Sequence, residues 1–351
     1  MGLKLSFTIN PPTPYHTVNF HLNRGIKQKW HNPAKSVDEI TVLLSEVLEN
    51  LKIITRLPDH FSVCILPSKV HFLSIIIPCY TRNIFIYPAE YSYESFLLPE
   101  FYKRKLFDQT LSQYSVKDLR FVKKGTAIYG QETDFITGGI LDFRSMLSIK
   151  KMNSEINLFL DISSSFVNYN FNYENVDGFV FSTDHVIGLF PGVTIFAIRN
   201  TLLEILLRHW RLLFITDQHK KFKNHSGSIF CHREVDLVKL YIFKEICMDL
   251  IQRDMKIIRN EMIYKSIILY NVLEKSNNFD LMIDEKNNRS QNILCARVLG
   301  PIRELKNYFL QKDILLDYIN NEKFGQIIRI GNFPVHSKEQ MIYLADMIES
   351  I

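Results

Sequence analysis

The spacing of apolar residues predicts alternating helices and buried strands along most of the chain. From Val37 to Ile54 apolar residues recur every three or four positions, and Ser36 with Glu39 forms a capping box in front of them, so we expect an amphipathic helix that ends before Pro58. Short apolar and β-branched runs follow, as is typical of strands buried on both faces of a parallel sheet. They lie at residues 62–66, 83–87, 126–129, 157–160, 178–181 and 194–198.

The second half of the chain is predicted to be richer in helix. A capping box from Thr201 to Glu204 begins one helix, and residues 234–275 predict two long helices that are separated near Asp254. The remaining pattern predicts a strand at 292–298, a helix near 301–308, a strand at 326–330 and a last helix capped by Ser337 with Gln340. Strands that alternate with helices and are followed by a smaller mixed segment favour an α/β body with an α+β domain.

Composition and charge exclude several classes of protein. The 351 residues are 46% apolar and 23% charged, which is typical of a globular chain long enough for two domains. Charge or proline interrupts every apolar run before the ~20 residues that a membrane helix needs, and the N-terminus has no signal-peptide pattern, so we expect a cytoplasmic protein. The net charge of +5 lies in short lysine clusters, which makes nucleic-acid binding an unlikely function.

Four segments carry a resemblance to a known family. Residues 329–340, RIGNFPVHSKEQ, resemble the closing segment of phosphoserine aminotransferases, which are class V aminotransferases that use pyridoxal phosphate (PLP). Residues 57–59, 131–133 and 160–192 agree with the same family in order and spacing. The resemblance covers almost the whole chain.

The resemblance implies a PLP-dependent transferase fold of type I, in the α/β class. In that fold a large domain holds a mostly parallel seven-stranded sheet flanked by helices, and we assign it to residues 16–255. A small α+β C-terminal domain is assigned to residues 256–351 together with residues 1–15.

The resemblance also implies roles for individual residues. Asp161 matches the aspartate that pairs with the pyridine nitrogen of the cofactor, although an aspartate at a strand end also commonly caps the turn that follows, here residues 163–165. Thr133 matches the threonine beside the phenolic oxygen of the cofactor, and Ser68 lies in the segment that would bind its phosphate. Arg329 matches the arginine that clamps the substrate α-carboxylate.

Departures from the family pattern affect the cofactor and the substrate. The family's Schiff-base lysine falls on His185, whose imidazole has no primary amine for covalent attachment but could still transfer a proton. In the phosphate segment Pro67 lacks an N–H donor and Lys69 adds bulk and charge. A His-Arg pair that binds the distal acid of the substrate is replaced by Lys35-Ser36, and the segment that would reach the partner's phosphate reads FKNHSG at 222–227.

We therefore expect a degenerate class V aminotransferase homologue, a pseudoenzyme that acts as a ligand-binding or partner subunit without covalent PLP. The first alternative is a PLP- or PMP-dependent aminotransferase in which His185 replaces the lysine, and the second is a nucleic-acid binder with a basic patch. The expected partners are a second copy of the chain or an intact paralogue, and the expected ligand is a small carboxylate. A cluster of possible metal ligands fits no zinc spacing, so no metal is expected; its members are Asp217, His219, His225, Cys231, His232 and Glu234.

Overall fold

The computed structural model describes residues 5–8, 17–28, 30, 37–72, 83–87, 126–140, 150–169, 173–184, 187–189, 191–203, 205 and 229–351. The expectations for His185, for Lys35-Ser36 and for residues 217–227 lie outside these ranges.

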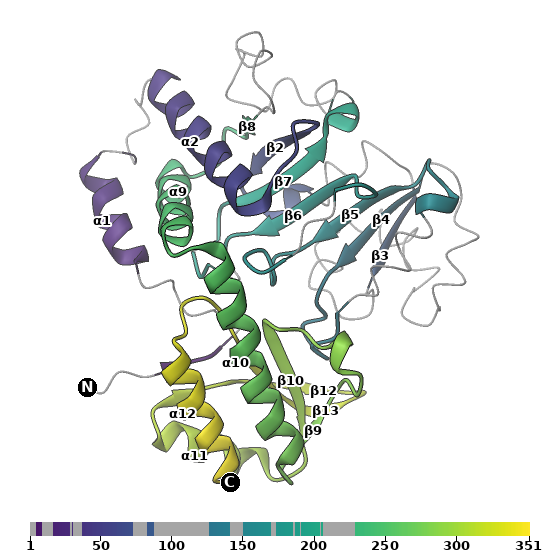
Figure 1. Ribbon diagram of the computed structural model, residues 1–351, viewed down its shortest axis with the longest axis vertical. Helices are drawn as coiled ribbons and strands as arrows, with labels where there is room; N and C mark the ends of the chain where they lie inside the picture. Colours follow the sequence, from purple (N-terminus) through teal and green to yellow (C-terminus); the bar gives the residue numbers. More distant parts are fainter. Residues whose placement is uncertain are drawn as a thin grey trace.

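A seven-stranded sheet forms the centre of the larger part of the molecule, in the order β3-β4-β5-β6-β7-β2-β8 (Figure 1). Among the described strands only β7 runs antiparallel to its two neighbours, β6 and β2, so the expected mostly parallel sheet is confirmed. The strands are β2 (Phe61–Leu66), β3 (Asn83–Tyr87), β4 (Thr126–Gln131), β5 (Asn157–Asp161), β6 (Gly178–Ser182), β7 (Thr194–Arg199) and β8 (Ile229–Cys231).

The six strands predicted from apolar runs are all present, each within two residues of its expected bounds. Every residue of β2 and of β6 is buried, which explains why these strands are continuous apolar runs without alternation. Strand β8 was not predicted, because a strand of three residues carries too little pattern to be distinguished from a loop.

Three helices pack together on one side of this sheet: α1 (Val18–Lys27), α2 (Val37–Thr55) and α9 (Leu237–Gln252) (Figure 1). The predicted α2 is confirmed, and its buried apolar side chains belong to the same core as those of the sheet. The expected helix at Thr201 is helical at residues 201–203 and 205. No helix in the described residues is long and apolar enough to cross a membrane.

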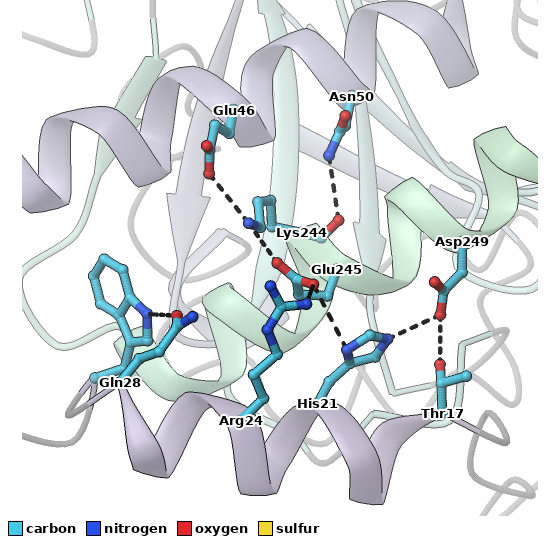
Figure 2. Close-up of polar contacts among 10 residues, drawn as sticks. Thr17, His21, Arg24, Gln28, Glu46, Asn50, Lys244, Glu245 and Asp249 are labelled. Atoms are coloured by element: carbon cyan, nitrogen blue, oxygen red, sulfur yellow. Dashed lines mark hydrogen bonds and ion pairs between the residues drawn. The ribbon is translucent and has the colours of Figure 1, made fainter.

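Helix α1, which the sequence pattern did not predict, is attached to α9 by polar contacts (Figure 2). Asp249 accepts hydrogen bonds from the hydroxyl of Thr17 at 2.7 Å and pairs with Nε2 of His21 at 2.9 Å. Arg24 donates to Glu245 at 3.0 Å. Because these pairs join residues more than 220 positions apart, no local sequence pattern predicts them.

The predicted break between two long helices is confirmed at Asp254. This residue adopts a positive φ of 65°, and its side chain caps α10 (Met255–Lys275) by accepting from the Lys256 N–H at 2.8 Å. The start of α9 was expected at Glu234 and lies instead at Leu237, because Asp236 is the residue that caps it. Helix α10 leaves the large sheet and runs along the smaller part of the molecule (Figure 1).

The smaller part has its own apolar core beneath a four-stranded antiparallel sheet in the order β12-β13-β10-β9. The first described strand, β1 (Leu5–Ser6), pairs with β11, so the N-terminal segment lies here too, although the domain boundaries stay a prediction. The capping box at Ser337 and Gln340 is confirmed. The other elements are β9 (Phe279–Leu281), β10 (Ile293–Val298), α11 (Ile302–Gln311), β11 (Ile314–Leu315), β12 (Asp317–Asn321), β13 (Gly325–Gly331) and α12 (Lys338–Glu349).

Candidate functional site

Asp161 is the last residue of β5, in the middle of the large sheet. It lies opposite Gln131 on β4 and Val180 on β6, and its side chain is completely buried. In an open α/β sheet, ligands bind at the carboxyl ends of the strands, so this position is the centre of the candidate site.

Four donors of the chain itself satisfy the Asp161 carboxylate. Oδ2 receives hydrogen bonds from Lys69 Nζ at 3.0 Å and from the Tyr129 hydroxyl at 2.6 Å. Oδ1 receives the Ser163 backbone N–H at 2.8 Å and the Ser163 hydroxyl. The contacts to Ser163 are the turn cap that was the alternative expectation for Asp161.

The charges of Asp161 and Lys69 form a buried ion pair, with side chains 0% and 12% exposed. Burial alone raises the pKa of Asp161, but the charge of Lys69 and the hydrogen bonds from Ser163, Tyr129 and Lys69 together hold that pKa below its usual value. Asp161 is therefore a carboxylate at neutral pH, and its counter-ion comes from the chain itself.

Lys69 belongs to a single helical turn, α3 (Lys69–His71), that follows β2. Ser68 precedes it in extended conformation, and its hydroxyl lies 3.0 Å from Nδ1 of His71. The Ser68 hydroxyl, expected to bind phosphate, therefore contacts an imidazole. Its phosphate role stays a prediction.

Thr133 lies just beyond β4 and is fully buried. Its hydroxyl donates to Oε2 of Glu132 at 2.5 Å and lies 3.3 Å from the Ser290 hydroxyl, which comes from the smaller part of the molecule. Burial raises the pKa of Glu132, the hydrogen bond from Thr133 opposes this, and the nearby charge of Asp161 adds to it. Thr133 thus joins the two parts of the chain; contact with a cofactor stays a prediction.

Arg329 on β13 lies directly opposite Asp317 on β12. Its Nη2 is 2.5 Å from Oδ2 of Asp317, and Nη1 donates to the Phe135 carbonyl at 3.2 Å. The Arg329 and Asp317 side chains are only 12% and 15% exposed, so the arginine is neither a solvated charge nor an open clamp. Binding of a substrate carboxylate by Arg329 stays a prediction, and such a ligand would have to compete with the Asp317 carboxylate for the guanidinium.

A second polar cluster lies where β2 and β8 end side by side. Nε2 of His71 is 3.5 Å from a carboxylate oxygen of Glu234, and the rings of His71 and His232 are 5.3 Å apart. Burial, with a smaller contribution from His71, lowers the pKa of His232. His232 and Glu234 belong to the ligand cluster expected from the sequence, whereas His71 was not expected there, because 161 positions separate it from His232 and no local spacing connects them.

The chain shares its fold with solved structures of low sequence identity. No protein-family model and no curated protein matches the sequence. A phosphoserine aminotransferase from Cytophaga hutchinsonii is similar to this chain, with a TM-score of 0.81 and 19% identity over 100% of this chain and 99% of that one. A phosphoserine aminotransferase from Bacillus circulans subsp. alkalophilus has a TM-score of 0.73 and 12% identity over 98% of this chain and 97% of that one. A PLP-bound phosphoserine aminotransferase from Trichomonas vaginalis has a TM-score of 0.70 and 15% identity over 98% and 99%.

The chain therefore has the PLP-dependent transferase fold of type I, as expected, in the form found in class V aminotransferases. Several of the structures that share this fold are phosphoserine aminotransferases. Because these identities are below 20%, the structural similarity establishes the fold alone. The activity must be argued from the residues of the site.

The residues of this site do not fit PLP held in the manner of the family. A protonated pyridine nitrogen needs an accessible carboxylate oxygen, and here both oxygens of Asp161 receive donors of the chain. A pyridinium at Asp161 would also place a second cation beside Lys69.

Proposed function

We propose that this protein is a degenerate homologue of the class V aminotransferases, which uses the inherited fold to bind a ligand or a partner and performs no covalent PLP chemistry. The observation that carries the proposal is the Lys69–Asp161 ion pair. It supplies Asp161 with an internal cation in place of the one that a cofactor would bring. The proposal rests on this geometry together with the histidine at position 185.

The arrangement of Arg329 supports the same proposal. Its guanidinium is occupied by the Asp317 carboxylate at 2.5 Å, as the guanidinium of a substrate clamp would be occupied by an acid. Both charges that would contact a substrate–cofactor complex thus have counter-ions within the chain. A ligand must either displace these counter-ions or bind elsewhere.

The proposed test is the visible absorption spectrum of the purified protein with added PLP, before and after borohydride. We expect no absorption band of a lysine-bound cofactor and no reduced PLP–lysine peptide, because position 185 carries an imidazole. A PLP–lysine adduct mapped to Lys69 or to any other lysine would overturn the proposal in favour of a working enzyme.

Two variants separate the contributions of the missing lysine and of the ion pair. His185→Lys restores an amine but keeps Lys69 on Asp161, so we expect it to bind PLP weakly and to show no transamination. Lys69→Ala combined with His185→Lys frees Asp161 as well, and we expect PLP to bind more tightly to it than to His185→Lys. Family-like activity from His185→Lys alone would show that the ion pair does not exclude the cofactor.

A further inference from the structure

We propose that His71, His232 and Glu234 bind a divalent transition-metal ion of the Zn²⁺ type. Imidazole nitrogens and a carboxylate oxygen are ligands that such ions favour, and three protein ligands leave a coordination position open. The proposal rests on side chains other than the three that bind Asp161, which are Lys69, Tyr129 and Ser163.

The sheet topology brings the three side chains together. Strands β2 and β8 are parallel neighbours, with Ile65 opposite Cys231, and the His232 N–H donates to the Ile65 carbonyl at 2.9 Å. Two segments remote in sequence therefore leave the sheet at the same edge. One continues into α3 with His71, and the other continues into the turn with His232 and Glu234.

The three side chains already bring their ligand atoms near one another. One ligand atom from each of the three side chains can be chosen so that all lie within 4.8 Å of one another, compared with about 3.3 Å between ligands arranged tetrahedrally around zinc. His71 and Glu234 are already at 3.5 Å. The Glu234 side chain is 60% exposed and that of His71 is 28% exposed, so both can move toward the buried His232.

Hydrogen bonds around the two imidazoles decide how they would bind. The Ser68 hydroxyl lies 3.0 Å from Nδ1 of His71 and can accept a hydrogen bond from Nδ1–H, which directs Nε2 to the metal in the usual outer-sphere arrangement. Nδ1 of His232 accepts a hydrogen bond from the Glu234 N–H at 3.2 Å, and metal binding would break it. If Nδ1 binds the ion, its lone pair is used; if Nε2 binds the ion, Nδ1 carries the proton and can no longer accept. Losing one such bond is a small effect beside the affinity of a three-ligand site.

A metal at this position would act on the candidate site through α3. His71 ends the same helical turn that Lys69 begins, so an ion held between His71 and β8 would fix the turn from which Lys69 reaches Asp161. Metal binding would thereby stabilise the large sheet at the edge formed by β2 and β8.

Calorimetric titration of untagged, EDTA-treated protein with ZnCl₂ tests the proposal. We expect one Zn²⁺ per chain, and a weakening of at least ~100-fold in His71→Ala and in Glu234→Gln, because even the loss of an outer-sphere partner weakens metal binding by about 10- to 100-fold. His60→Ala is the matched control: His60 is an exposed histidine beside the start of β2, outside the cluster, and its loss should leave the affinity unchanged.

Two further measurements distinguish specific zinc binding from misfolding of the variants and from adventitious zinc binding. Zn²⁺ should raise the melting temperature of the wild type and of His60→Ala but not of the other two variants, whose metal-free melting should equal that of the wild type. Co²⁺ bound in place of zinc should show the visible absorption of a low-symmetry site with nitrogen ligands. Zinc binding that is undetectable, or equal in all four proteins, would mean an adventitious ion only and would overturn the proposal.

Discussion

Nζ of Lys69 lies 3.0 Å from Oδ2 of Asp161 across 92 positions of sequence, and the carboxylate is completely buried. Taking two charges out of water is unfavourable unless they are paired and hydrogen-bonded, and Tyr129 and Ser163 supply the remaining donors. The pair is therefore a structural element of this protein as well as the feature that, in our proposal, replaces the pyridine nitrogen of a cofactor.

Removing one charge of this pair should destabilise the protein strongly. Lys69→Met leaves the buried carboxylate without its cation, and we expect the free energy of unfolding to fall by about 3–5 kcal/mol. Lys69→Met combined with Asp161→Asn should recover most of that loss, which urea denaturation of the single and double variants measures. Arg297→Met removes the cation from a half-exposed pair with Asp280 and should change stability by less than about 1 kcal/mol. Equal effects of Lys69→Met and Arg297→Met would contradict the buried pair.

The same pair predicts a loss of stability in acid. The folded-state pKa of Asp161 is below its unfolded value of about 3.9, so the unfolded chain binds the proton more readily as pH falls. The contribution of Asp161 is fully present above about pH 4 and is lost as the pH falls toward the folded pKa. Urea midpoints measured from pH 6 to pH 2 should show a step that Asp161→Asn removes. An unchanged profile in that variant would count against the depressed pKa.

Carboxylate binding, if it uses Arg329, should respond in opposite directions to two changes. Arg329→Ala removes the charge-assisted contact and should weaken a small monocarboxylate by roughly 10- to 100-fold. Asp317→Asn removes the internal competitor at 2.5 Å and should strengthen the same ligand. Calorimetry against mono- and dicarboxylates measures both, and we expect no preference for dicarboxylates because Lys35-Ser36 lacks the second arginine. Binding that ignores both variants would place the ligand elsewhere.

His336 should make stability depend on pH between about 3 and 6.5. Its Nδ1 accepts a hydrogen bond from the Phe333 N–H at 3.2 Å, and its Nε2 lies 3.0 Å from the Ser6 carbonyl. Burial, with a contribution from the charge of Lys265, lowers the pKa of His336 to about 3, although the hydrogen bond to Ser6 opposes this shift. In that interval the unfolded chain binds a proton that the folded chain does not, so stability falls as the pH is lowered. The full effect is on the order of 5 kcal/mol.

The measurement for His336 is the free energy of unfolding from pH 7.5 to pH 4. His336→Gln keeps a donor and an acceptor but does not titrate, so its profile should be flatter than that of the wild type. His60→Gln removes an exposed histidine and should reproduce the wild-type slope. A wild-type slope in His336→Gln would show that other groups cause the pH dependence.

We also expect the protein to function as a dimer, either with a second copy or with an intact paralogue, as the resemblance implies. Its melting temperature should then rise with protein concentration, because association stabilises the folded state. Sedimentation velocity should detect a dimer at micromolar concentration, and a folded monomer under those conditions would contradict the expectation. Co-expression with an intact aminotransferase of the class would distinguish mixed dimers from two homodimers.

The sequence by itself determined most of the local structure of this protein. Side-chain periodicity and caps depend on neighbours within a few positions, so the strand from 83 to 87, the helix break at Asp254 and the capping box at Ser337 could be identified without tertiary information. The tail at residues 329–340 and the spacing of three other segments then indicated the fold. Short edge strands such as β8 and β9 were missed because packing, and not a local pattern, defines them.

Only the tertiary structure decided what the charged side chains contact. Lys69 could be placed near the phosphate segment from sequence, but its contact with Asp161 depends on the position of α3 relative to the end of β5. Asp317 became the partner of Arg329 through the register of β12 against β13, and His71 met His232 because β2 and β8 are neighbours. Strand order and register are set by the packing of the whole core, so a pair of charges far apart in sequence carries no local signal of its contact.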